Sequence, residues 1–251
     1  MRVLGVDVGG SGIKGALVNT ETGKLITERL RFSTPQPATP KAIVKVIQKI
    51  VLEFKWKGRI GVGFPAVIKG NRVHTASNIS NSWIGTDAVK LITKATGRPC
   101  IVINDADAAV LAEVNYGSKR LKKGTVLFLT VGTGIGTAIL TNGHLLPNTE
   151  FGDLYLKKVG NAEGYCADSA RKRYRLTWKE WAGRFNKYLK QVYFLTRPDL
   201  ILIGGGASKK SDRYREYLDI KTPIRYASLK NEAGIIGAAW AAAQKRSFKN
   251  R

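Results

Sequence analysis

Two glycine-rich turns constrain the fold of this chain more than any other feature. Each follows a short apolar strand and leads straight into a second strand, first in Leu4–Gly12 and again in Phe128–Gly136. A P-loop and a dinucleotide-binding turn both open a helix, so this pattern excludes them. Clustered glycines let backbone N–H groups approach an anion closely. The sequence predicts two similar hairpins that bind phosphate, and a plain hairpin is the alternative for either one alone.

The periodicity around the turns repeats the order meander, helix, strand, helix in both halves of the chain. Duplicated α/β lobes that face each other leave a cleft, a common place for a ligand. We therefore expect one lobe over 1–106, with a C-terminal helix at about 236–251 packing back on it, and a second lobe over 107–235. The predicted strands span 2–8, 13–19, 25–33, 59–64, 100–104, 125–131, 135–140 and 200–203, and the predicted helices span 40–54, 86–96, 107–116, 177–195 and 232–243.

Composition places the chain among ordinary folded proteins. Its 251 residues are 43% hydrophobic, enough for two compact cores. Cys100 and Cys166 form no close pair, so two reduced thiols are favoured over a disulfide and no zinc site is expected. No apolar stretch is long enough to cross a bilayer, and Asp7 interrupts any secretion signal. The expected location is the cytoplasm, without a membrane partner.

The charge of the chain is strongly positive. Lys and Arg total 42 against 18 Asp and Glu, which gives a net charge of +24. Both halves of the chain carry the excess, so it belongs to the folded surface rather than to a tail. Such a field concentrates polyanions near the protein. Nucleic acid, an acidic membrane and inorganic polyphosphate are all candidates, and simple solubility is the alternative.

A carboxylate at a strand–helix junction is the candidate catalytic base. Asp105 follows the predicted strand at 100–104 and precedes an alanine-rich helix. It could accept the proton of a hydroxyl group that attacks a phosphoryl group. Asp also favours helix caps, but Asp107 is placed better for that role, which would leave the Asp105 carboxylate available for catalysis.

Phosphate and magnesium would be bound by residues of the two turns. Asp7 ends the first strand, where its carboxylate could orient Mg²⁺ through the water shell of the ion. Thr133 adds a hydroxyl donor to the second turn. The phosphate-binding candidates are Asp7, Gly9, Gly10, Ser11, Gly12 and Lys14 in the first hairpin, and Thr130, Gly132, Thr133 and Gly134 in the second.

Longer motifs resemble the ROK family (repressor, open reading frame, kinase), and within it the polyphosphate glucokinases. The resemblance covers nearly the whole chain. It implies a two-lobed actin-like ATPase (ribonuclease H-like) fold with duplicated lobes and a central cleft. The motifs that carry it are the segments 33–40, 83–88, 147–150, 178–184, 198–200 and 204–210.

The resemblance also implies roles for individual residues. Asp105 matches the catalytic base of the family. The sugar ligands would be Asn78, Asn104, Asp105 and Glu150, while Gly205 and Gly206 would border the donor end of the cleft. The family normally reads Glu-x-Gly-His where this chain has Asp153 in the last position. An ionised Asp accepts hydrogen bonds but cannot donate them, and it adds a carboxylate near Glu150. Altered sugar binding, a harmless change and lost activity are the three alternatives.

The resemblance implies a polyphosphate glucokinase that transfers a phosphoryl group from inorganic polyphosphate, or ATP, to the 6-hydroxyl of glucose with Mg²⁺. An ATP-only hexokinase of other sugar specificity, a sugar-responsive regulator and a non-catalytic polyanion- or sugar-binding protein are the alternatives. No nucleic-acid partner is expected, and the protein would be a monomer or homodimer. The basic residues expected beside the phosphate turns are Lys119, Arg120, Lys122, Lys123, Lys209 and Lys210.

Overall fold

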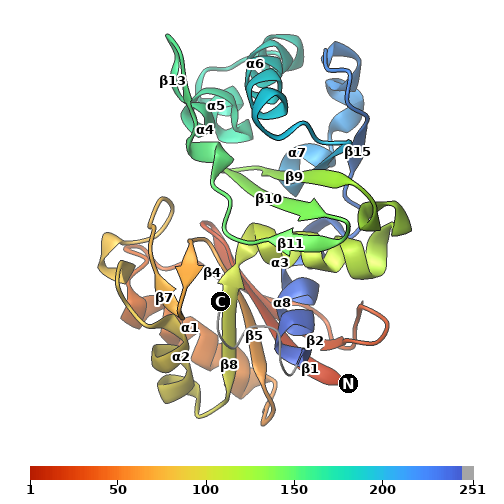
Figure 1. Ribbon diagram of the computed structural model, residues 1–251. Coiled ribbons are helices and arrows are strands. Elements are labelled where there is room, and N and C mark those ends of the chain that lie inside the picture. The colour runs from red at the N-terminus through yellow and green to blue at the C-terminus, as the bar shows by residue number, and fades with distance from the viewer. Residues whose placement is uncertain (245–251) are drawn as a thin grey trace. The chain divides into compact units, whose positions relative to one another are not determined.

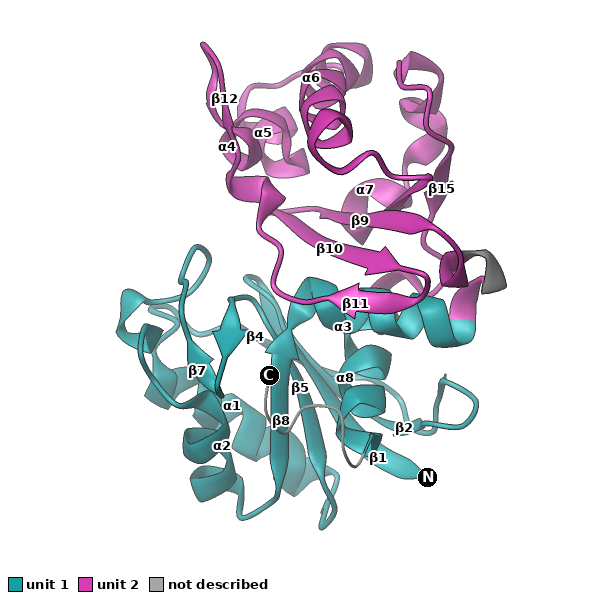
Figure 2. Cartoon of the chain, viewed as in Figure 1, with its two compact units in different colours: residues 1–116, 232–251 teal, residues 117–231 magenta. Residues whose placement is uncertain are grey.

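The computed structural model describes residues 1–244, apart from the side chains of Lys119 and Arg120. Two compact units divide the chain (Figure 2): Met1–Tyr116 with the segment that starts at Glu232, and Gly117–Asn231. The predicted boundary at 106/107 is therefore displaced, because helix α3 (Asp105–Ala112) packs against α8 (Ala233–Ala243) inside the first unit. The part of the predicted C-terminal helix over 245–251 lies outside the described residues.

The first unit is built on a mixed sheet with the order β3-β2-β1-β5-β8 (Figure 1). The predicted hairpin is present, since β1 pairs antiparallel with β2, and β1, β5 and β8 run parallel to one another. The single strand predicted at 25–33 is instead two short strands that both pair with β2. The strands are β1 (Arg2–Val8), β2 (Gly12–Asn19), β3 (Lys24–Leu25), β4 (Leu30–Ser33), β5 (Ile60–Phe64) and β8 (Cys100–Asn104), with β6 (Ile68–Lys69) and β7 (Arg72–Val73) in a separate hairpin.

Two helices and one face of this sheet form the core of the first unit. Helix α1 (Pro40–Glu53) starts with proline at its first position, and the Thr39 hydroxyl accepts a hydrogen bond from the Ala42 N–H. Helix α2 (Ala88–Thr96) is capped by Asp87 and ends at Gly97 in the left-handed region, close to the prediction. Apolar residues at helical spacing in α1 are buried with side chains of β1, β5 and α2.

Helix α8 covers the other face of the sheet, with its backbone in contact with the backbone of the strands. A Cβ atom at Gly61 of β5 would lie 1.9 Å from the Ala238 carbonyl oxygen, and one at Gly5 of β1 would lie 2.1 Å from that of Ile235. Because these strand positions have no side chain, the alanine-rich helix lies directly on the sheet. The same face carries Asp7, two residues beyond Gly5.

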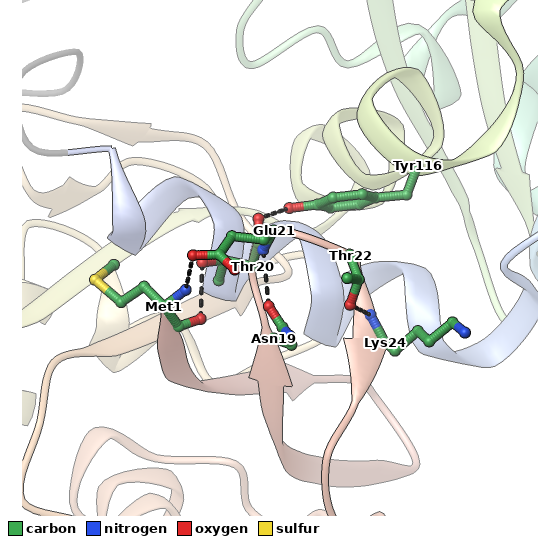
Figure 3. A network of polar contacts seen from close by, with 7 residues as sticks. All are labelled: Met1, Asn19, Thr20, Glu21, Thr22, Lys24 and Tyr116. Carbon is green, nitrogen blue, oxygen red and sulfur yellow. Dashed lines mark hydrogen bonds and ion pairs between the residues drawn. The ribbon is translucent and has the colours of Figure 1, made fainter.

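The far end of the α3 segment is anchored on the turn between β2 and β3. The chain continues from α3 into a π-helical turn (Glu113–Gly117), which replaces the end of the helix predicted over 107–116. The Tyr116 hydroxyl donates to the Thr20 carbonyl oxygen, and the N-terminus pairs with Glu21 at 2.8 Å (Figure 3). Burial raises the pKa of Tyr116 to about 12, so the phenol remains a donor at neutral pH.

The second unit has a five-stranded sheet with the order β11-β10-β9-β14-β15. Here too an antiparallel hairpin, β9–β10, is extended by strands parallel to its first strand. Helix α6 (Trp178–Thr196) begins with a Thr177–Glu180 capping box and packs Trp181 and Phe185 into the core. The other elements are β9 (Thr125–Val131), β10 (Ile135–Thr141), β11 (His144–Leu146), β12 (Tyr155–Leu156), β13 (Gly160–Asn161), β14 (Leu200–Gly204), β15 (Ile224–Tyr226), α4 (Ala162–Cys166), α5 (Asp168–Arg173) and α7 (Gly205–Ser208).

Both cysteines are buried and free, which confirms the two reduced thiols. Burial raises the pKa of Cys166 to about 12 and that of Cys100 further, so both thiols stay protonated at neutral pH. Among residues 1–244, no helix has both the length and the apolar character needed to cross a membrane.

Candidate active site

The carboxyl ends of three parallel strands bring Asp7 and Asp105 to the same edge of the first sheet. Asp7 of β1 is opposite Gly63 of β5, and Phe64 is opposite Asn104 of β8. A Cβ atom at Gly63 would lie 3.7 Å from the Asp105 Cα atom and from the Gly234 carbonyl oxygen, and one at Gly234 would lie 2.9 Å from Asp7 Cγ. Ligands bind at this edge of parallel sheets, and small residues here leave them room.

Asp105 is the first residue of α3, and its neighbour Asn104 is the cap. The Asn104 Oδ1 atom accepts hydrogen bonds from the N–H groups of Ala106, at 2.9 Å, and of Asp107, at 3.0 Å. Asp107 was predicted as the cap, and this prediction is wrong: Asp107 lies inside the first turn and is buried. Asp105 remains half-buried, and its Oδ1 accepts from the Ala106 N–H at 2.8 Å. The first turn of the helix thereby fixes the carboxylate in place.

The capping role limits what Asn104 can offer to a sugar. Its side-chain oxygen already accepts two hydrogen bonds, and its Nδ2 donates to the Ala66 carbonyl oxygen at 3.2 Å. An amide nitrogen carries two hydrogens. One N–H therefore remains, so Asn104 could act toward a substrate only as a donor.

The first glycine-rich turn lies at the same edge of the sheet. Within the turn, the Gly9 N–H donates to the Gly12 carbonyl oxygen at 3.1 Å. Asp7 and Lys14 face each other across the hairpin, with Nζ and Oδ2 3.1 Å apart. A Cβ atom at Gly10 would lie 3.9 Å from that of Asn78, so Asn78 lies beside this turn. The structure therefore groups the phosphate candidates of the first hairpin with one predicted sugar ligand.

A divalent cation would find an oxygen ligand at Asp7. Its carboxylate is largely buried, with one oxygen engaged by Lys14. Within the described part of the chain, no group of three or more His, Cys, Asp and Glu side chains is arranged to hold a metal ion. Mg²⁺ is often bound by one or two carboxylates together with water and substrate phosphates. The donor set at Asp7 fits that kind of binding.

The second glycine-rich turn is held by residues of α4 and α5. The Ser169 N–H donates to the Gly132 carbonyl oxygen at 3.1 Å. The Ser169 hydroxyl donates to the Thr133 carbonyl oxygen at 2.6 Å. The Glu163 carboxylate accepts from the Ile135 N–H at 2.8 Å. Thr133 itself is exposed at the tip of the turn, where its hydroxyl and backbone N–H are accessible to a ligand.

The third glycine-rich segment lies next to this turn. Gly205 has a φ of +75°, and a Cβ atom there would lie 2.7–3.0 Å from backbone atoms of Val131. A side chain would therefore be both strained and obstructed at this position. A Cβ atom at Gly132 would lie 3.9 Å from the Gly206 nitrogen. Both predicted phosphate segments of the second unit thus lie at one edge of its sheet.

Three carboxylates gather near the second turn. Glu150 directly precedes the 3₁₀ turn over Phe151–Asp153, and Asp153 ends this turn and accepts a hydrogen bond from Asn161 at 3.3 Å. Burial, followed by the charges of Asp153 and Glu163, raises the pKa of Glu150 to about 7. Burial also raises the pKa of Glu163, and Asp153 adds to the effect. The expected closeness of Asp153 to Glu150 is confirmed, and its consequence is a carboxyl group that titrates near neutral pH.

Sequence reasoning missed Glu163 as a member of this cluster. The available signal was a single acidic residue in α4, between the buried residues Ala162 and Cys166. A carboxylate in such surroundings needs a polar partner, which here is the Ile135 N–H at the second turn.

The basic candidates separate into two places within the second unit. Lys209 and Lys210 directly follow α7, whose first residue touches Val131, so they lie close to the second turn. Lys122 and Lys123 precede β9, whereas the turn follows it. A strand of this length separates its ends by about 20 Å, so the expectation that they lie beside the turn is wrong. The predicted contributions of Lys119 and Arg120 lie outside the described side chains.

The mixed α/β architecture with its two glycine-rich turns matches that of known sugar kinases. The model of the ROK family matches residues 3–170. Over 240 residues the chain is 45% identical to a polyphosphate glucokinase of Mycobacterium tuberculosis, which covers 94% of this chain and 89% of that one. The crystal structure of an inorganic polyphosphate/ATP-glucomannokinase from Arthrobacter sp. strain KM matches with a TM-score of 0.93 and 44% identity, covering 98% of this chain and 99% of that one. A ROK family glucokinase from Streptomyces griseus shares the fold, with a TM-score of 0.82 and 23% identity over 97% of this chain and all of that one. The chain belongs to the ROK family.

Proposed function

We propose that this protein is a polyphosphate-dependent glucokinase. It transfers a phosphoryl group from inorganic polyphosphate, and also from ATP, to the 6-hydroxyl of glucose. The observation that carries the proposal is the half-buried Asp105 carboxylate, fixed at the start of α3 at the same sheet edge as Asp7 and the first glycine-rich turn. Relatives named polyphosphate glucokinase and polyphosphate/ATP-glucomannokinase support the choice of donor and sugar.

The proposal includes a two-lobed actin-like fold, in which each compact unit is one lobe. Its support is the pairing order that recurs in both units: an antiparallel hairpin, β1–β2 or β9–β10, extended by parallel strands. In each unit the glycine-rich turn occupies the same place in this order.

In the proposed reaction Asp105 accepts the proton of the sugar 6-hydroxyl as the oxygen attacks the terminal phosphorus. The new P–O bond forms as the bond to the rest of the donor breaks, and the leaving phosphate chain keeps the electron pair of that bond. The protein contributes mainly by positioning the reactants and by electrostatic stabilisation of the transition state, as is general for phosphoryl transfer. The backbone N–H groups of the turns at Gly9–Gly12 and Gly132–Gly134 would hold donor phosphates. Asp7 would hold Mg²⁺ through water, and the ion would neutralise charge on the donor.

Sugar hydroxyls would be bound by Asn78, Asn104, Glu150 and Asp153. Asn104 donates through its remaining N–H, and the carboxylate of Glu150 accepts. Asp153 occupies the position of the family histidine and would bind sugar hydroxyls only as an acceptor.

A panel of donors and sugars tests the proposal. With Mg²⁺, the purified protein is expected to form glucose 6-phosphate faster from polyphosphate than from ATP, with glucose and mannose compared at matched concentrations. Raising the salt concentration should reduce polyphosphate use more than ATP use, because screening weakens capture of a long polyanion. Absence of turnover with either donor would contradict the kinase assignment.

The raised pKa of Glu150 predicts how sugar use depends on pH. If the ionised carboxylate accepts from sugar hydroxyls, kcat/KM for glucose should rise with pH through about 7, the pKa of this group. Replacing Asp153 with Asn removes one of the negative charges that raise this pKa, so the transition should move to lower pH. The measurement is kcat/KM for glucose against pH in both proteins at saturating donor. An unshifted transition in Asp153→Asn would mean that Glu150 is not the titrating group.

A further inference from the structure

A basic surface around Trp178 adjoins the second glycine-rich turn. We infer that this surface binds the distal phosphates of the polyphosphate donor, beyond the phosphates that the turn itself holds. The inference rests on the proposed function. The Trp178 surface consists of Arg171 and Lys172 of α5, Trp178 of α6 and Lys210 after α7, and Arg173 and Lys209 are their exposed neighbours in sequence.

Two segments lead from the phosphate turn to this surface. Helix α5 starts at the turn, where Ser169 donates both its N–H and its hydroxyl to the turn carbonyls. One helical turn further on come Arg171, Lys172 and Arg173. Helix α7 also starts at the turn, with Gly205 against Val131, and leads to Lys209 and Lys210. Basic residues therefore follow both glycine-rich segments that border the donor position.

The two segments converge on one tryptophan ring. The Arg171 guanidinium lies 4.1 Å from the centre of the Trp178 ring, and the Lys210 ammonium lies 5.8 Å from it. Trp178 in turn stacks on the buried Tyr214, with ring centres 5.7 Å apart. Trp178 packs against the core of the second unit, and its ring also positions the two basic side chains.

A buried carboxylate fixes the α5 side of the surface. Asp168 pairs with Arg171 at 2.9 Å and with Lys172 at 2.8 Å. Burial opposes ionisation of Asp168, but the hydrogen bonds from Lys172 and Arg171 outweigh it and lower its pKa. Asp168 is the single acid among the α5 residues and Lys209–Lys210, against five basic residues. The surface therefore keeps a positive charge while its α5 side is held in a fixed arrangement.

The shape of the donor selects polyphosphate over ATP for this surface. ATP ends its phosphate chain in a nucleoside, whereas polyphosphate carries a negative charge on every unit along its length. A polymer that continues past the turn can contact the Trp178 surface as well, so its capture gains further charge contacts and releases further counterions. The effect should be much larger with long chains than with tripolyphosphate.

The test uses the double variant Lys172→Gln/Lys210→Gln in the full-length protein. We expect KM for long-chain polyphosphate to rise about 3- to 10-fold, the loss expected for two exposed ion pairs. KM for tripolyphosphate and for ATP should rise much less, and the salt dependence of long-chain KM should become shallower. Lys157→Gln/Lys190→Gln removes two lysines from β12–β13 and α6 of the same unit and is the matched control. A second variant, Arg173→Gln/Lys209→Gln, changes the exposed neighbours of these residues and should raise KM for long-chain polyphosphate less than the first variant does.

Equal changes for long-chain polyphosphate and tripolyphosphate, or a change as large in the control, would overturn the inference. Equilibrium titration with each polyphosphate, without sugar, separates this result from the proposed function. If the wild type binds long-chain polyphosphate more tightly than the variants do but transfers no phosphate, polyphosphate binding by the Trp178 surface is supported and the proposed function is wrong. An RNA oligonucleotide that displaces long-chain polyphosphate at equal phosphate concentration would overturn the choice of polyphosphate.

Discussion

Replacing Asp105 with Asn is expected to lower kcat by about 10²- to 10⁴-fold, the usual contribution of a general base. The substitution keeps the shape of the side chain, and the new amide oxygen can still accept the Ala106 N–H that now holds the carboxylate at 2.8 Å. The helix cap is unaffected because Asn104 supplies it. The defect should therefore appear with both polyphosphate and ATP, without loss of thermal stability.

Asp87→Asn is the matched control for this experiment. Asp87 caps α2 in the same unit, where its Oδ1 accepts from the Lys90 N–H at 2.8 Å. Asn caps helices about as well as Asp, so this variant should retain wild-type kcat. If Asp105→Asn kept more than about a tenth of the wild-type kcat, it would fall outside the range expected for a general base, and Asp105 could not hold that role.

Replacing Gly61 with Ala is expected to destabilise the first unit by about 2–3 kcal/mol, because overpacked cores typically lose 1–3 kcal/mol. The new methyl group would lie 1.9 Å from the Ala238 carbonyl oxygen and 2.4 Å from its carbon, both backbone atoms of α8. Since a helix backbone cannot rotate aside as a side chain can, α8 must shift away from the sheet. The same helix carries Gly234 against Asp7, so turnover should fall as well.

Gly183→Ala provides the comparison for Gly61→Ala. Gly183 lies on the exposed side of α6, and a Cβ atom there meets nothing within 4 Å. Alanine in a helix interior is favoured over glycine by about 0.5–1 kcal/mol, so this variant should be at least as stable as the wild type. Urea denaturation followed by circular dichroism measures both. Equal stabilities of the two variants would contradict the close packing of α8 on the sheet.

The parts of the fold that depend on local pattern could be predicted from the sequence. The hairpins at both glycine-rich turns follow from apolar strands that lead directly into and out of glycines. Helix α2 could be placed almost to its ends because Gly97 supplies a left-handed C-terminal cap. Short elements such as α4, α5 and β12–β13 were missed, because six residues or fewer show too little periodicity to identify them.

The site could be predicted where it follows from strand ends, and not where it depends on tertiary packing. The position of Asp105 at a strand–helix junction was readable, but the choice of Asn104 over Asp107 as the cap depends on where α3 actually begins. Lys122 and Lys123 were misplaced although the predicted strand over 125–131 already put them at its start and the turn at its end, about 20 Å apart. Glu163 joins Glu150 and Asp153 only through the fold of α4.

Phosphorus NMR of a nucleotide-free reaction tests whether the protein transfers phosphate from polyphosphate to glucose through Asp105. Purified protein, Mg²⁺, glucose and long-chain inorganic polyphosphate are incubated with no ATP or ADP present, in parallel with Asp105→Asn. In the wild type, the signal of a phosphate monoester on the 6-oxygen of glucose is expected to grow as polyphosphate is lost, while the variant stays silent on the same timescale. A wild type that forms no sugar phosphate from polyphosphate, or a variant that forms it as fast as the wild type, would contradict the proposed function.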